Sequence, residues 1–121
     1  MAATNTTLAP DPVGTTIISN TNIGTTIIYG STAACSMYLI HIDNTGNTST
    51  AAYLRIVDAA SNVSTSTTDD YRFYAPAGET ATYVCEVGMP MATGLAYWCT
   101  TSNADQNASA PANPVSVKIL I

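Results

Sequence analysis

Short runs of apolar and β-branched residues alternate with polar segments along the whole chain. Residues 36–42 alternate strictly between two faces, and no run has the spacing of an amphipathic helix. One face of that segment carries Tyr38, Ile40 and Ile42, and the other carries Met37, Leu39 and His41. The pattern predicts an all-β, antiparallel β-sandwich or jelly-roll-like domain of about eight short strands. The expected strands are residues 13–19, 23–29, 36–42, 51–57, 71–75, 80–87, 95–100 and 115–121.

The five letters GTTII occur twice, at residues 14–18 and 24–28. Asn20 and Asn22 lie between the two copies, and asparagine tolerates left-handed backbone and forms Asx-turns. We therefore expect a β-hairpin or two successive strands of a meander. A repeat array would need at least a third copy, which the chain does not contain.

A second hairpin is expected where residues 36–42 and 51–57 flank the turn-rich segment DNTGNTST. Two longer polar segments, residues 58–70 and 101–114, read as surface loops. The last strand ends on Ile119, Leu120 and Ile121, which should pair inside a sheet or be covered by a partner.

Residues 1–12 are small and polar and are interrupted by Pro10 and Pro12. Proline disfavours a helix there, so this segment should be an extended N-terminal arm or an ordered edge segment, followed by one domain over residues 13–121. The first residues have neither the basic nor the apolar region of an export signal, and no stretch approaches the roughly 18 apolar residues of a membrane span.

Charge is scarce in this chain of 121 residues: 9% of residues are charged, against about 25% in an average soluble domain. The formal net charge is -5, and the only basic residues are Arg55, Arg72 and Lys118. A nucleic-acid partner needs a basic footprint, so none is expected, and an anionic membrane surface is disfavoured for the same reason.

Three cysteines, Cys35, Cys85 and Cys99, cannot all pair within one chain. Reduced, buried thiols in a protein assembled in a cytoplasm are the favoured interpretation. A disulfide between Cys85 and Cys99 stays open if their strands are neighbours.

No constellation for catalysis, cofactor binding or metal binding is apparent. His41 and Asp43 share a strand face, but no nucleophile motif accompanies them, and a structural or solvent-facing histidine is the expected role. A calcium site from Asp58, Asp69, Asp70 or Asp105 lacks the spaced acidic loop of known calcium motifs. For the strand aromatics, a core role is favoured over a sugar-stacking platform. These are Tyr71, Phe73, Tyr74, Tyr83, Tyr97 and Trp98.

Residues 51–121 resemble a domain that recurs in small structural proteins of tailed bacteriophages. The resemblance covers a YLK-like strand, a polar loop, a strand leading into Pro-Ala-Gly, the segment ATGLAY, a polar loop and a final strand. The matching positions are Tyr53, Leu54 and Arg55; Pro76, Ala77 and Gly78; Gly88; and Ala92, Thr93, Gly94, Leu95, Ala96 and Tyr97.

The resemblance implies a capsid decoration (cement) protein or a piece of a head or tail fibre. The expected partner is the major capsid protein on the outer surface of the mature head, with a homotrimer as the expected oligomer and synthesis in the host bacterial cytoplasm. An extended segment can add a strand to a partner's exposed sheet edge, so the arm is the expected contact. The candidate contact residues are Thr4, Asn5, Leu8, Pro10, Asp11, Pro12 and Val13.

Two alternatives remain open. A fibre or adhesin domain would use residues 61–70 or 101–114 to bind host glycans or a receptor. A glycan-acting enzyme would need an acid pair that only Glu79, Glu86 and a few aspartates could supply. No enzymatic activity is expected.

Overall fold

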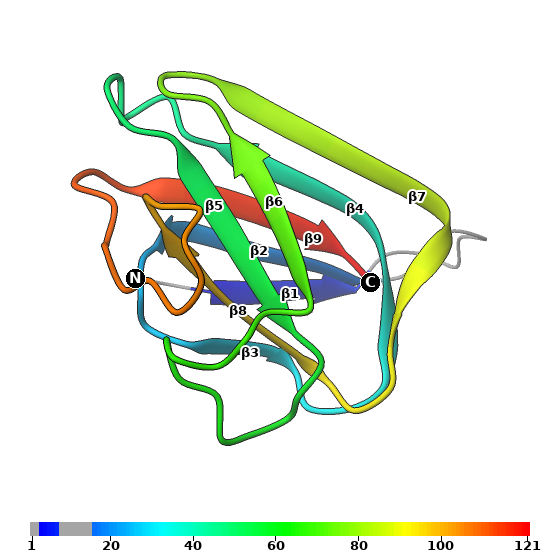
Figure 1. Ribbon diagram of the computed structural model, residues 1–121. Coiled ribbons are helices and arrows are strands. Elements are labelled where there is room, and N and C mark those ends of the chain that lie inside the picture. The colour runs from blue at the N-terminus through cyan, green and yellow to red at the C-terminus, as the bar shows by residue number, and fades with distance from the viewer. Residues whose placement is uncertain (1–2, 8–15) are drawn as a thin grey trace.

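The computed structural model describes residues 3–7 and 16–121, which form two antiparallel sheets packed face to face (Figure 1). The all-β sandwich expected from the sequence is confirmed. The strands are β1 (Ala3–Thr7), β2 (Thr16–Ile23), β3 (Ile28–Ser31), β4 (Cys35–Asp43), β5 (Ala52–Val57), β6 (Tyr71–Ala75), β7 (Thr80–Met91), β8 (Leu95–Thr100) and β9 (Val115–Leu120).

The chain changes sheet repeatedly. The five-stranded sheet has the order β1-β2-β9-β4-β7, and the four-stranded sheet has the order β3-β8-β5-β6. In Figure 1 the four-stranded sheet, with β5 and β6, lies in front of β2 and β9. Only β1 with β2 and β5 with β6 are both consecutive in the chain and paired, so every other connection crosses between the sheets.

The expected hairpin or meander of the GTTII doublet is wrong in both forms, because the two strands do not pair. Residues 16–18 of the first copy lie in β2 of the five-stranded sheet, and Ile28, the last residue of the second copy, begins β3 of the other sheet. The Asx bond does form, because the Asn22 N–H donates to Asn20 Oδ1 at 3.1 Å. It accompanies a register shift between Asn20 and Ile23 inside β2, and the strand continues without reversing.

The second expected hairpin is also wrong, since β4 pairs with β7 and β9 while β5 pairs with β6 and β8. The alternation along β4 is broken too, because Met37 is fully buried together with Ile40 and Ile42. The register with β7 shifts between Met37 and Leu39. On β7 the irregular stretch contains Gly88 at φ 82°, where a Cβ would lie 2.8 Å from the Tyr38 ring.

The core lies between the sheets and is built from aligned aliphatic rows. Ile18, Ile119 and Ile40 are register partners across β2, β9 and β4, and all three are fully buried. Leu54 and Ile56 close the core from β5. The C-terminal strand is thus paired on both sides, as its apolar sequence predicted.

Most of the strand aromatics serve the core, as predicted. Tyr97 belongs to the buried cluster, and Tyr71, Phe73 and Tyr83 pack against it. The Tyr83 hydroxyl donates to the Tyr74 carbonyl and accepts the Tyr74 N–H at 3.3 Å. These bonds join β7 to β6, the edge strand of the opposite sheet.

Buried asparagines join three of the crossings at one end of the sandwich. Asn44 is fully buried and donates to the carbonyls of Thr50, at 2.9 Å, and Pro76, at 3.1 Å. Asn47 donates to Asn44 Oδ1 and to the Asn113 carbonyl, both at 3.0 Å, and its Oδ1 accepts the Asn113 N–H. The β4–β5, β6–β7 and β8–β9 connections are therefore linked through side-chain amides.

Replacing Asn44 with alanine should lower the free energy of unfolding by about 2–3 kcal/mol, because buried carbonyls and the Asn47 amide lose their partner. Asn22→Ala, at an exposed side chain, should change it by no more than about 0.5 kcal/mol. Chemical denaturation of both variants checks this. Equal effects would mean that the Asn44 amide does not stabilise the crossings.

Candidate functional site

The described part of the expected contact arm is a strand. Thr4 and Asn5 lie in β1, the outermost strand of the five-stranded sheet, with exposed side chains. Asn5 Nδ2 lies 3.4 Å from the Gly30 carbonyl of β3, across the sandwich. The other candidates lie outside the described residues: Leu8, Pro10, Asp11, Pro12 and Val13.

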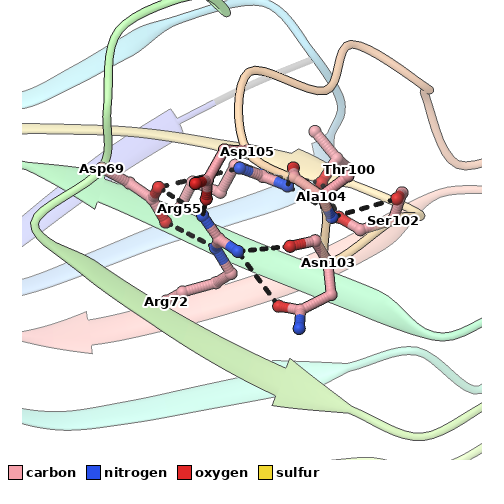
Figure 2. A network of polar contacts seen from close by, with 8 residues as sticks. All are labelled: Arg55, Asp69, Arg72, Thr100, Ser102, Asn103, Ala104 and Asp105. Carbon is pink, nitrogen blue, oxygen red and sulfur yellow. Dashed lines mark hydrogen bonds and ion pairs between the residues drawn. The ribbon is translucent and has the colours of Figure 1, made fainter.

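A second candidate surface is formed by the two polar loops, residues 58–70 and 101–114, which meet on the outer side of the four-stranded sheet. A network of arginines and aspartates joins them (Figure 2). The sequence placed both loops on the surface, but it gave no sign that they are neighbours.

Arg55 is the buried centre of this network. It lies on β5, and its side chain is fully buried. Its Nε donates to Thr100 Oγ1 at 2.9 Å, and its Nη2 donates to the carbonyls of Ser102, at 2.7 Å, and Ala104. The guanidinium therefore fixes the start of the second loop to the sheet.

Arg72 joins the two loops. It lies opposite Arg55 on β6 and forms two 2.7 Å hydrogen bonds with the Asp69 carboxylate of the first loop. It also donates to Asp105 at 2.7 Å and to the Asn103 carbonyl in the second loop. Figure 2 shows Asp69, Arg72 and Asp105 converging at this junction.

The Asp69 carboxylate offsets the repulsion between Arg55 and Arg72. Two arginines directly opposite on neighbouring strands repel each other, and Asp69 lies within 2.7 Å of Arg72 and 3.7 Å of Arg55. Burial acts to raise the pKa of Asp69, but the hydrogen bond from Arg72 and the nearby guanidinium charges lower it overall. Desolvation lowers the pKa of Arg55, whereas the bonds to Asp69 and Asp105 raise that of Arg72.

The outer face of the four-stranded sheet also buries a large side chain beside Arg55. Trp98 is a register partner of Arg55, so both point away from the core that contains Tyr97 and Cys99. Trp98 is nevertheless fully buried. Arg55, its register partner, holds the start of the second loop on this same face.

Asp58 fixes the opposite end of the first loop to the turn between β7 and β8. Its carboxylate accepts the N–H groups of Ala92, at 2.8 Å, Thr93, at 2.8 Å, and Gly94, at 3.2 Å. A Cβ at Gly94 would lie 2.8 Å from two backbone oxygens, so only glycine fits. The ATG segment thus has a structural role in this chain.

The acidic residues weighed for calcium have other partners. Asp69 and Asp105 bind Arg72, Asp58 binds the turn, and Asp70 accepts the Asp58 N–H at 2.7 Å. Within residues 3–7 and 16–121, no group of three or more His, Cys, Asp and Glu residues is arranged to hold a metal ion. Glu79 and Glu86 are seven residues apart on or beside β7, roughly 23 Å along an extended strand.

His41 lies on the outer face of the five-stranded sheet, where its Nδ1 shares a 2.8 Å hydrogen bond with Thr82 Oγ1. The cysteines are free thiols. Cys85 is on β7 and Cys99 on β8, in different sheets, so the condition for their pairing is not met. Cys99 is fully buried, and desolvation raises its pKa to about 12.

No protein-family model, curated protein or solved structure matches this chain. Among the described residues, no helix is long and apolar enough to cross a membrane.

Removing the charge of Asp69 should strongly destabilise the fold. Asp69→Asn leaves two opposed arginines without their shared carboxylate, and loss of one partner of a buried pair costs about 3–5 kcal/mol. Asp105→Asn, at a side chain that is 79% exposed, should cost at most about 1 kcal/mol. Urea unfolding of both variants provides the comparison, and similar losses would contradict the role given to Asp69.

Asp58 should make stability depend on acidity. Hydrogen bonds from the backbone of Thr93, Ala92 and Gly94 hold its pKa below the ordinary value of 3.8. The stabilisation is therefore present above about pH 4 and is lost as the pH falls through the lower, folded-state pKa.

The measurement is the difference in melting temperature between the wild-type protein and Asp58→Asn, recorded from pH 7 to pH 2. The difference should shrink at the acidic end. A constant difference over the whole range would show that the Asp58 charge contributes nothing.

Proposed function

We propose that this chain is a non-catalytic structural protein that decorates the outer surface of a mature bacteriophage head and stabilises its lattice. The resemblance of residues 51–121 to phage structural domains favours this role. The position of β1 also supports it, and that position is the observation on which the proposed mode of contact rests.

β1 is the outermost strand of the five-stranded sheet, so one side of its backbone has no strand beside it among the described residues. An unpaired edge can receive an extended segment from another chain. The side chains of residues 3–6 are exposed, and none of these residues belongs to the buried core cluster. A partner can therefore engage this strand without disturbing the core.

A decoration protein stabilises a capsid by mass action, because it binds the mature lattice in preference to other states. In the proposed arrangement the chain forms a homotrimer, and each trimer touches several copies of the major capsid protein. Linked weak contacts then give avidity without one strong site.

A second candidate function is a fibre or adhesin domain. The observation in its favour is the Arg72 junction, which brings residues 58–70 and 101–114 onto one surface. Binding loops held by a rigid scaffold are a common arrangement in recognition proteins.

Deleting residues 1–12 should abolish co-sedimentation with mature, undecorated heads, whereas the full chain should bind them saturably and should not bind unexpanded procapsids. The deletion should keep a β-rich circular dichroism spectrum, since residues 3–6 lie outside the core cluster. A double variant, Asn103→Ala with Asp105→Ala, serves as the loop control and should bind normally.

Binding by a folded deletion variant would contradict the role of the arm. Loss of binding only in the loop double variant would transfer the contact to the loops. Absence of binding to either kind of head by the full chain would overturn the decoration function and favour the adhesin alternative.

A further inference from the structure

The outer face of the five-stranded sheet carries a shallow depression of about 260 Å³, on the side of the molecule opposite the two polar loops. It lies over the central strands β2, β9 and β4. Its lining residues are Ser19, Thr21, His41, Asp43, Ser116, Val117 and Lys118.

The strand register places the polar side chains of this depression in two rows across the sheet. Ser19, Lys118 and His41 are direct partners across β2, β9 and β4, and Thr82 continues the row on β7. Asp43 and Ser116 are partners in the next outward-facing row, two residues along the strands. The two rows are therefore about 7 Å apart.

Lys118 provides a positive charge that no described carboxylate neutralises in an ion pair. Arg55 and Arg72, the other two basic residues, are bound to carboxylates, whereas Lys118 takes part in no ion pair within the described part of the chain. Its side chain is exposed. In a protein of net charge -5, this is the place where a ligand carboxylate finds a cation.

The neighbouring groups have capacity for further hydrogen bonds. The His41 Nδ1 bond to Thr82 orients the ring and leaves Nε2 for a ligand. Asp43 Oδ1 accepts from the N–H and the hydroxyl of Thr45, so its Oδ2 can accept from ligand hydroxyls. Hydroxyl groups of Ser19 and Thr21 line the same hollow.

An apolar row borders the polar ones. Ile17, Leu120, Leu39 and Val84 are successive register partners from β2 to β7, and they face outward because the alternate residues are in or against the core. Val84 is 65% exposed. A ligand over the depression would thus meet apolar surface beside its polar contacts.

We propose that this depression binds an acidic monosaccharide, with its carboxylate on Lys118 and His41 and its ring hydroxyls on Asp43 and the serine and threonine hydroxyls. A carboxylate alone would satisfy the cationic end but leave the Asp43 row unused. The hollow is smaller than the roughly 300–1,000 Å³ of sites for drug-sized ligands, which suits one sugar ring. This inference does not rest on capsid binding.

The test is titration of the ¹⁵N-labelled full chain, followed by amide chemical shifts. The probes are glucuronate, galacturonate and N-acetylneuraminate, with methyl glucoside and acetate as neutral-sugar and carboxylate controls. At least one acidic sugar should give saturable shifts at Ser19, His41 and Lys118. Each control should bind at least tenfold more weakly.

Two substitutions should separate the parts of the site. Lys118→Gln and Asp43→Asn should each weaken the acidic sugar at least fivefold, while Asn107→Asp, which changes net charge as Lys118→Gln does, should not. Unchanged shifts elsewhere in each free variant verify folding. The proposal is overturned if none of the three acidic sugars binds, if acetate binds equally well, or if Lys118→Gln binds as the wild type does.

Discussion

The fold depends on satisfying the backbone wherever the chain leaves one sheet for the other. A strand that ends at a crossing loses its ladder partners, and buried peptide groups left unpaired would be costly. This chain supplies the missing bonds from short polar side chains. Asn44 and Asn47 do so at one end of the sandwich, and Asp58 does so at the β7–β8 turn. These contacts hold the β4–β5, β6–β7, β7–β8 and β8–β9 connections in place at the ends of the sheets.

Most of the few basic side chains also stabilise the fold through contacts within the chain. Arg55 would be a buried cation without an ion-pair partner if Asp69 were absent, and Asp69 also binds Arg72, which holds Asp105 of the second loop. Two of three basic side chains are therefore committed to internal structure. The five-stranded sheet keeps Lys118, so the two outer faces of one small domain differ in both covering and charge.

Most strand positions could be predicted from the sequence, because alternation and β-branching report on a half-buried pleated surface. The expected strand at residues 23–29 is wrong, since Ile23 ends β2 and β3 begins only at Ile28. Residues 71–75 and 95–100 match β6 and β8 residue for residue. Partner choice could not be predicted. A turn such as DNTGNTST reverses the chain equally well into a neighbouring strand or into the facing sheet, and only the packing of both layers decides between them.

For the candidate sites too, local features could be predicted from the sequence, whereas contacts between distant residues could not. The exposed positions of Thr4 and Asn5 agree with a polar edge segment, since a strand edge reads as polar and irregular in sequence. The junction at Arg72 could not be predicted, because Arg72 and Asp105 are more than thirty positions apart in the sequence. The row through Lys118 could not be predicted either, because His41 and Lys118 are more than seventy positions apart. An isolated arginine inside an apolar strand, as in YLRIV, is the one local signal that a buried charge needs a partner.

The two outer faces impose different demands on any partner. The loop face is held by hydrogen bonds that already use the Asp69 carboxylate and much of both guanidinium groups, so a ligand there must bind the remaining exposed loop groups or break internal bonds. The face around Lys118 has donors and acceptors that the fold leaves uncommitted. The β1 edge adjoins this second face, since Thr4 is the register partner of Ser19. A partner that pairs with β1 would therefore lie beside the depression, and binding at the two places would be coupled by proximity alone.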